Sequence, residues 1–517
     1  MPVITIKDQN KIIQCEQKEN LLRVLLEHHI FVDNPCNGKG KCKKCTVRIW
    51  KGEQYEEVLS CLYEVDHDIE VEMIKKEKKH KVLTEGYLPE FEKEERKEGF
   101  GAAIDIGTTT VVCSLIDLST GKEVAASSMI NAQKHYGLDV LTRITYEYEN
   151  QETGIQQLQT TIVDSVNQML NDACKKANRS VDHIVEIDVA ANCTMTHMLL
   201  GVDARSLGRA PYKPQFIDAQ KIMASSIGIK ASKNAVLYCL PQVSAYIGAD
   251  IVAGAYVCDL HHKKGNTLFI DIGTNGEIIL SVRGELYSCS CAAGPALEGM
   301  NITSGMRAAE GAVEKITIKE DRLEIQTIGE EKAEGICGSG ILSVVGELLK
   351  ANLLKKSGAF IKKEKIPKED FKYNLIRMNG TKREFLLQEN PEIIVTQSDI
   401  RQVQLAKGAI LSGFMALLEK AGIGMNDLDE VLIAGQFGAH LSADLLTGTG
   451  ILPLEVENKI QYVGNTSKTG AYMALMSNKV KSEMEKLACN IHYMELAETE
   501  NYERIFADCM IFPDHHN

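Results

Sequence analysis

The chain has 517 residues, 44% of them hydrophobic and 25% charged, and a formal net charge of −13 at pH 7. This length supports two or three domains with substantial cores, and the negative charge argues against a general nucleic-acid binder. No apolar run approaches the ~18 residues of a membrane span, so we expect no membrane contact. The N-terminal MPVITIKDQN has no signal-peptide pattern, and fifteen cysteines in such a chain favour reduced thiols in a cytoplasmic protein.

Residues 1–74 predict a small α+β domain. VITIK and KIIQCE have the pattern of a β-hairpin, and NLLRVLLEHHI places four leucines on one helical face. TVRIW and DIEVEMI follow, the second alternating apolar and acidic residues as a half-buried strand does. Hairpin, helix, loop and further strands in this order favour a β-grasp fold.

A cysteine-rich loop interrupts this domain. Its cysteines have the spacing C-x5-C-x2-C-x15-C and are Cys36, Cys42, Cys45 and Cys61. Four thiolates suit either tetrahedral zinc or a 2Fe–2S cluster. A zinc ribbon normally pairs two C-x2-C knuckles, whereas the plant-type ferredoxin pattern is C-x4-C-x2-C with a distant fourth cysteine. The spacing therefore favours a 2Fe–2S cluster, with zinc as the alternative.

Residues 75–98 have a different composition from the domain before them. Fifteen of these 24 residues are charged, which predicts a solvated linker with little core. Fully extended, the segment would span roughly 80 Å at about 3.3 Å per residue. We expect it to let the first domain move relative to the rest of the chain.

From residue 99 onward, strand-like and helix-like segments alternate, as in an α/β protein. AAIDIGTTTVVCSLID at 102–117 is repeated as LFIDIGTNGEIILSV at 268–282, so the tetrapeptide DIGT recurs 166 residues later in the same context. The repeat predicts two related lobes facing each other, which we place at 99–265 and 266–517.

Each DIGT follows one strand and precedes another, so each is predicted to be a hairpin turn and not a strand-to-helix phosphate loop. Backbone N–H groups and threonine hydroxyls in such turns can bind phosphate, and the preceding aspartate can hold Mg²⁺. The predicted ligands of ATP and Mg²⁺ in the two turns are Asp105, Gly107, Thr108, Thr109, Asp271, Gly273, Thr274 and Asn275.

With its two turns the sequence resembles the sugar kinase, chaperone and actin superfamily (ASKHA) of two-lobed ATPases. In that fold an adenosine motif follows, and EVLIAGQFGAHL at 430–441 is similar to it, with Gly435 and Gly438 where backbone could approach the nucleoside. GICGSGI at 335–341 is a further glycine-rich turn, either a nucleotide contact or a packing point between lobes. Sugar kinases carry an acidic base in a context like that of Asp250, which makes Asp250 the first candidate base; Glu277 is the second.

The complete chain resembles the reductive activators of corrinoid-dependent enzymes. The resemblance rests on the cluster loop, both DIGT turns and blocks such as NAQKHYGLDVLTRI, ANCTMTHMLLG, LPQVSAYIGADI, CAAGPALEGMNITSGMRAAEGAV and TQSDIRQVQLAKGAI. It implies a β-grasp ferredoxin domain followed by a two-lobed actin-like ATPase. It also implies a function: ATP-dependent return of a Co(II) corrinoid to Co(I), with one electron passing from the 2Fe–2S cluster.

The resemblance further implies a corrinoid protein as partner and an upstream low-potential electron donor, and it allows a homodimer. Two alternatives stay open from the residues. One is a small-molecule kinase fused to a ferredoxin domain, which would phosphorylate a substrate without a protein partner. The other is a non-enzymatic redox sensor whose cluster gates nucleotide and partner binding.

Overall fold

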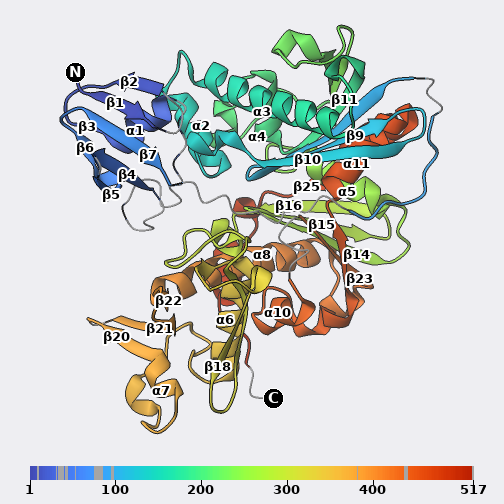
Figure 1. The fold of residues 1–517 in the computed structure, drawn as a ribbon. Helices are drawn as coiled ribbons and strands as arrows, with labels where there is room; N and C mark the ends of the chain where they lie inside the picture. Colours follow the sequence, from blue (N-terminus) through green and yellow to red (C-terminus); the bar gives the residue numbers. More distant parts are fainter. Residues whose placement is uncertain are drawn as a thin grey trace.

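The structure is a computed structural model that describes residues 1–7, 11–28, 30, 32, 40, 45–52, 54–74, 86–94, 98–380, 382–435 and 441–514. In the view of Figure 1 a small β-sheet domain at the N-terminus lies to the left of helix α2, and two larger lobes, each built on a six-stranded sheet, face each other. No helix among the described residues is both long and apolar enough to cross a bilayer.

The N-terminal domain has a five-stranded sheet in the order β2-β1-β7-β4-β5. Strand β1 pairs antiparallel with β2 and parallel with β7, and buried leucines of helix α1 pack against the sheet, which confirms the β-grasp prediction. The bounds are β1 Val3–Ile6, β2 Lys11–Gln14, β4 Thr46–Lys51, β5 Gln54–Leu59, β7 Ile69–Met73 and α1 Leu21–Glu27, with a small pair formed by β3 Glu19–Asn20 and β6 Glu64–Val65.

The first lobe is built on a sheet in the order β10-β9-β8-β11-β13-β12. Strands β8 and β9 form the predicted hairpin around the first DIGT turn, while β11 runs parallel to β8. Helices α2, α3 and α4 share one apolar core with these strands. The bounds are β8 Phe100–Ile106, β9 Thr110–Asp117, β10 Lys122–Ile130, β11 Ile184–Ala191, β12 Gln220–Met223, β13 Val236–Cys239, α2 Val140–Glu149, α3 Gly154–Lys176 and α4 Cys193–Leu200.

The second lobe repeats this arrangement in a sheet ordered β24-β23-β14-β15-β16-β25. Strands β14 and β15 form the hairpin of the second DIGT turn, and β23 runs parallel to β14 as β11 does to β8. The fold class expected from the repeat is confirmed. The bounds are β14 Asn266–Ile272, β15 Gly276–Val282, β16 Glu285–Cys291, β23 Glu430–Ala434, β24 Ile460–Gly464, β25 Ile491–Tyr493, α6 Gly338–Lys350, α8 Gln397–Ala421, α10 Ala443–Gly448 and α13 Tyr502–Cys509.

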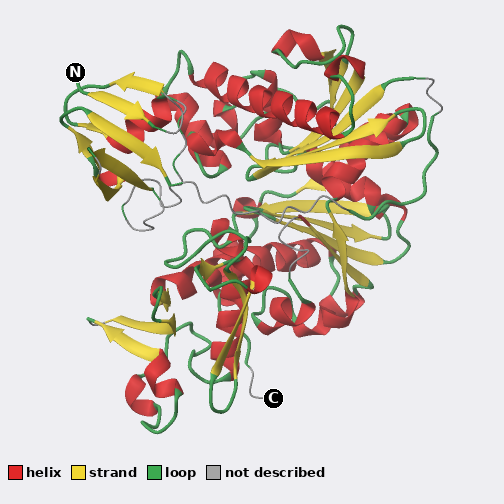
Figure 2. Ribbon diagram, in the orientation of Figure 1, coloured by secondary structure: helices red, strands yellow, loops and turns green. Residues whose placement is uncertain are grey.

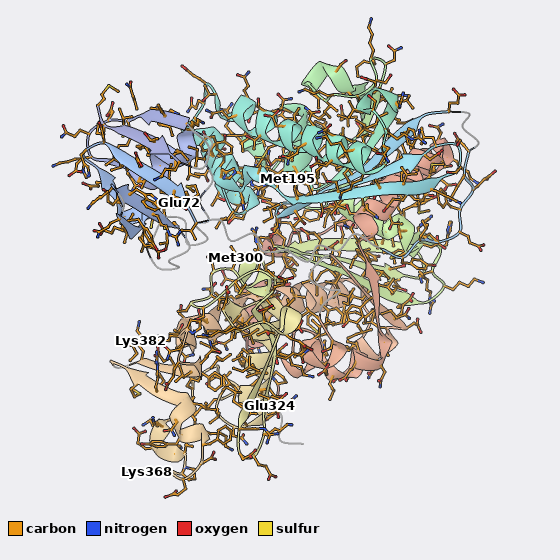
Figure 3. All side chains as sticks on the ribbon, in the orientation of Figure 1. Glu72, Met195, Met300, Glu324, Lys368 and Lys382 are labelled. Atoms are coloured by element: carbon orange, nitrogen blue, oxygen red, sulfur yellow. The ribbon has the colours of Figure 1, made fainter. Side chains whose placement is uncertain are left out.

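Two small three-stranded sheets extend from the second lobe away from the first (Figure 2). Glu324 and Lys382 mark them in Figure 3, far from the facing sides of the lobes where Met195 and Met300 lie. Their bounds, with the adjoining short helix, are β17 Ala312–Ile318, β18 Leu323–Thr327, β19 Gly335–Ile336, β20 Ile376–Asn379, β21 Lys382–Gln388, β22 Ile393–Thr396 and α7 Lys372–Leu375.

Helices α5 (Ala249–Val257) and α11 (Thr466–Met476) lie between the two large sheets. Their apolar residues share one buried cluster with Ile116 and Ala190 of the first sheet and with Phe269 and Leu432 of the second. Packed between α5 and β8, α11 lies on the first lobe although it comes from the end of the chain. The predicted boundary between the lobes, at residues 265 and 266, therefore stays a prediction. The buried cluster contains residues from both sides of that boundary.

Residues 86–94, part of the predicted linker, are docked on the two-lobed part of the chain. The amide of Tyr87 donates to the Val463 carbonyl at 2.8 Å, and the amide of Glu94 donates to the Met476 carbonyl at 2.9 Å. The Phe91 ring meets Tyr472 edge-on with centroids 5.9 Å apart. Residues 86–94, which we call the strap, are therefore not a solvated segment. Apolar residues between the charged ones hold the strap against α11.

Helix α12 (Asn478–Asn490) joins the first lobe through a buried ion triad. The Lys481 ammonium lies 2.9 Å from a carboxylate oxygen of Asp188 and also contacts Glu186, both on β11. Asp188 is fully buried and Lys481 is 8% exposed. Removing the cation would take a positive charge away from two carboxylates in a low-dielectric site.

We predict that Lys481→Ala lowers the free energy of unfolding of the two lobes by about 3 kcal/mol, the usual cost of breaking a buried ion pair. The control is Lys479→Ala, two residues away, whose ion pair with Glu92 is exposed. That variant should change stability by less than about 0.5 kcal/mol. Urea unfolding followed by circular dichroism compares them, and equal stability of both variants would contradict a structural role for the triad.

Candidate functional site

The two DIGT turns face each other across a cavity of about 200 Å³ between the lobes. In the first turn, the Gly107 amide donates to the Thr110 carbonyl at 2.9 Å, and in the second the Gly273 amide donates to the Asn275 carbonyl at 2.9 Å. A Cβ on Gly107 would lie 2.9 Å from the Thr110 carbonyl oxygen, so this position requires glycine. Both turns are tight and present backbone and hydroxyl groups to the cavity.

Every predicted ATPase site residue that the structure describes lines this cavity, whereas Gly438 lies outside the described residues. The residues brought together are Asp105, Gly107, Thr108, Thr109, Asp250, Asp271, Gly273, Thr274, Asn275, Glu277 and Gly435. Gly435 has φ +87°, and a Cβ there would lie 2.4 Å from an Asp271 carboxylate oxygen. Gly338 and Ser339 also line the cavity, so the glycine-rich turn before α6 faces this site.

Four of the carboxyl groups that line the cavity, those of Asp105, Asp250, Asp271 and Glu277, have a raised pKa. Burial raises the pKa of Asp250 to about 8, with further contributions from Asp271 and Asp105. Burial, and then Asp105, raises the pKa of Asp271 to about 7. The pKa of Glu277 is raised well above its usual value by burial, then by Asp250 and Asp271. Such a group of crowded carboxylates fits a divalent cation, which would relieve their repulsion.

Asp105 is held by the N-terminal end of α11. The Asn465 amide and the Ser467 hydroxyl each donate to its carboxylate at 2.8 Å. Burial raises the pKa of Asp105, and these two hydrogen bonds oppose the rise. The carboxylate is therefore oriented by the helix that also receives the strap.

The first turn rests on buried polar side chains of its own lobe. The Arg143 guanidinium donates to the Thr108 carbonyl at 2.5 Å and to the Gly137 carbonyl at 3.0 Å. Asn192 donates to the Thr108 hydroxyl at 3.0 Å. Arg143 is fully buried, and burial lowers its pKa to about 9. These contacts fix the position of the turn before any ligand is bound.

Sequence reasoning missed two residues of the second lobe that line the cavity, Glu298 and Arg307. The Glu298 carboxylate accepts hydrogen bonds from the hydroxyls of Thr109 and Thr274 at 3.0 and 2.5 Å. The buried Nε of Arg307 has no hydrogen-bond partner among the described residues. Both lie in CAAGPALEGMNITSGMRAAEGAV, a block that carried the family resemblance but to which no role was assigned.

The predicted cluster site lies in the N-terminal domain. Cys45 and Cys61 are buried and form no disulfide, with their sulfur atoms 3.2 Å apart, while Cys36 and Cys42 lie outside the described residues. The Asn20 side chain donates to the Cys61 carbonyl at 3.0 Å, and the Ser60 hydroxyl donates to the Cys45 carbonyl at 2.9 Å. Two adjacent buried thiols without a disulfide fit two ligands of one metal ion.

Comparison with known families supports the three-part organisation. Residues 4–70 match the 2Fe-2S iron-sulfur cluster binding domain, residues 100–263 match the RACo middle region, and residues 265–517 match the C-terminal domain of RACo, the ASKHA domain. The three matches follow one another along the chain with the order that the sequence predicts.

Individual relatives cover most of the chain. It is 29% identical to the corrinoid activation enzyme RamQ of Eubacterium limosum, over 93% of this chain and 94% of that protein. It is 26% identical to a Co(II) methylated amine-specific corrinoid protein reductase of Methanosarcina barkeri, over 79% of this chain and 76% of that protein. The solved structure of a reductive activator for a corrinoid, iron-sulfur protein superposes with a TM-score of 0.71 at 28% identity and covers 99% of both chains.

The carboxyl cluster predicts a stability that falls as pH rises. Asp250 and Asp271 have higher pKa values folded than unfolded, so the folded state binds more protons, and their ionisation between about pH 4 and pH 8 disfavours folding. Asp250→Asn should therefore raise the unfolding temperature of the nucleotide-free protein at pH 8 and leave it nearly unchanged at pH 4. The gain should be at least about 1 kcal/mol, since one unit of pKa shift is worth about 1.4 kcal/mol.

Thermal unfolding at both pH values measures this difference. Asp218→Asn serves as the control, because Asp218 is exposed and does not line the cavity. A stabilisation of equal size in the control, or none in Asp250→Asn at pH 8, would contradict the crowding of charge in the cavity.

Proposed function

We propose that this chain, which belongs to the RACo family of reductive activators of corrinoid proteins, transfers one electron from a 2Fe–2S cluster to the Co(II) corrinoid of a partner protein and couples that transfer to ATP hydrolysis. The observation that carries the proposal is the pair of hairpin turns facing one carboxylate-lined cavity, in the same chain as paired buried thiols. The alternatives of a fused kinase and a redox sensor gain no specific support from these contacts.

An energetic argument explains why both halves are needed. Co(I) corrinoid is a very strong reductant, whereas plant-type 2Fe–2S centres have potentials near about −400 mV. Each 100 mV of uphill transfer costs about 2.3 kcal/mol for one electron. A nucleotide can supply such energy only if its binding favours one conformation over another. The two lobes, which meet at the cavity, are the element that ATP would bias.

Within the cavity we assign each group a task. Backbone N–H groups of the two turns and the hydroxyls of Thr109 and Thr274 bind the phosphates of ATP, while Asp105 and Asp271 hold Mg²⁺. Gly435 lets the backbone approach the nucleoside. The base that activates water is Asp250 or Glu277, and the pKa of about 8 for Asp250 suits a proton acceptor near neutral pH.

Arg307 adds a positive charge to this set. Arg307 lines the cavity, as do Gly338 and Ser339 at the N-terminal end of α6, and its Nε lacks a hydrogen-bond partner among the described residues. A preorganised cation beside transferring phosphate stabilises the charge that develops in the transition state. We therefore assign Arg307 to the terminal phosphate.

In the N-terminal domain, the thiolates of Cys36, Cys42, Cys45 and Cys61 would hold the 2Fe–2S cluster, which supplies a one-electron donor when bound. Buried Cys45 and Cys61 keep their sulfur atoms away from solvent. A low-potential upstream donor would recharge the site between turnovers. The corrinoid protein is the electron acceptor, and a homodimer is compatible with the proposal.

The central test mixes the purified chain, a reductant and a Co(II) corrinoid protein, with and without Mg-ATP, and follows the visible spectrum of cobalt. Co(I) should form only with nucleotide. Cys45→Ser should abolish it with loss of iron and of the brown colour, whereas Asp271→Asn should abolish it with iron retained, since only the nucleotide site is changed.

Cys15→Ser is the control for the thiol variant, because Cys15 is buried in the same domain but its sulfur contacts the Pro2 carbonyl and not another thiol. It should keep iron and activity. Equal rates of Co(I) formation without ATP would refute the coupling, and phosphorylation of a small molecule without any partner protein would favour the kinase.

For Arg307, we expect Arg307→Ala to lower the rate of ATP hydrolysis by about 100-fold, the typical effect of removing one preorganised charge-stabilising donor. The affinity for ADP should change much less, since the charge acts on the terminal phosphate. Arg209→Ala, at an exposed position, is the matched control and should hydrolyse ATP at the unchanged rate. Steady-state release of phosphate measures both, and an Arg307→Ala rate near that of the control would remove this assignment.

A further inference from the structure

One carboxylate connects the phosphate turns of both lobes. Glu298, the last residue of the short 3-10 helix Pro295–Glu298, accepts from the Thr274 hydroxyl of the second turn at 2.5 Å. Its other carboxylate oxygen accepts from the Thr109 hydroxyl of the first turn at 3.0 Å. The two hydroxyl oxygens are themselves only 3.4 Å apart. The bridge therefore joins the two turns where their threonine hydroxyls lie side by side.

The chemistry of this bridge is that of an oxyanion held by two hydroxyl donors. A threonine hydroxyl has one proton to donate, and at both positions Glu298 accepts it. A phosphate oxygen placed between the turns would accept hydrogen bonds from the same two hydroxyls. It would also carry negative charge into the place of a carboxylate, so the two anions cannot both occupy it.

We propose that Glu298 occupies the place of the terminal phosphate in the nucleotide-free protein and thereby determines how the site distinguishes a nucleoside triphosphate from a diphosphate. This inference rests on the proposed function, because it assumes that the cavity binds ATP. A triphosphate must break both hydroxyl contacts and displace the carboxylate before its terminal phosphate can bind. A diphosphate ends one phosphate earlier and leaves the bridge in place.

The exchange gives Glu298 a role on both sides of the reaction. Before ATP binds, the carboxylate keeps Thr109 and Thr274 joined, so the turns of the two lobes stay together. When the terminal phosphate accepts the hydrogen bonds of both threonine hydroxyls, the ligand takes over from Glu298 as the connection between the two lobes. After hydrolysis the carboxylate competes for the same hydroxyls, which favours release of the cleaved phosphate.

The test measures equilibrium binding of Mg-ADP and of a non-hydrolysable Mg-ATP analogue to the full chain by calorimetry. Glu298→Ala should bind the triphosphate analogue about tenfold more tightly than the wild type, with ADP affinity changed less than about twofold. Tenfold corresponds to about 1.4 kcal/mol. Glu298→Gln, which keeps the shape and an acceptor oxygen but removes the charge, should give a smaller gain in the same direction.

Glu285→Gln is the matched control, since this carboxylate lies at the far end of β16 and does not line the cavity. It should bind both nucleotides as the wild type does. If Glu298→Ala changes both affinities equally, or loses ATP hydrolysis with an unchanged ratio of affinities, the inference is wrong. If the alanine variant has a lowered unfolding temperature, the glutamine variant decides by the same ratio. A wild-type chain that binds neither nucleotide would instead refute the proposed function.

Discussion

The burial of several acidic side chains in one cavity is the constraint on which the rest of the ATPase depends. Asp250, Asp271 and Glu277 come from three different elements, and the pKa of each is raised first by burial and then by neighbouring carboxyl groups. The protein tolerates this arrangement because two shared-core helices and two sheets fix the backbone around the cavity. The free energy stored in that crowding is available to any ligand that brings positive charge between the lobes. The Mg²⁺ ion that accompanies ATP has this character, which links the electrostatics of the cavity to the proposed cycle.

The polar contacts around the turns have opposite effects. Arg143 and Asn192 donate hydrogen bonds to Thr108 of the first turn, so the position of this turn does not depend on a ligand. Glu298 binds both turns on the side that faces the cavity, where a ligand must compete with it. A site that is fixed on one side and exchangeable on the other can bind phosphate without first having to assemble. Its conformational response is then concentrated in the contacts between the lobes, which is where coupling to a partner is needed.

The sequence was sufficient to predict the parts that depend on local pattern. Alternating apolar residues and glycine-containing turns specified both hairpins, and the placement of Asp105 and Asp271 at the ends of equivalent strands followed from the repeat. Glu298 and Arg307 could not be found this way, because they lie on irregular backbone and reach the cavity only through the packing of the second lobe. The docked position of residues 86–94 was also missed, since charge dominates that composition and Phe91 and Tyr87 are too few to form a periodic pattern.

The strap has a geometric consequence for the range of the electron donor. Gly86 forms a bridge with Gly464 on the ATPase, so the tether of the N-terminal domain is measured from residue 86 and not from residue 98. Twelve residue steps from 74 to 86 cannot exceed about 40 Å, half of the roughly 80 Å that 24 residues would allow. Halving the radius reduces the accessible volume about eightfold, and effective concentration rises as that volume shrinks. The docked strap thus confines the donor's search to the neighbourhood of its own ATPase.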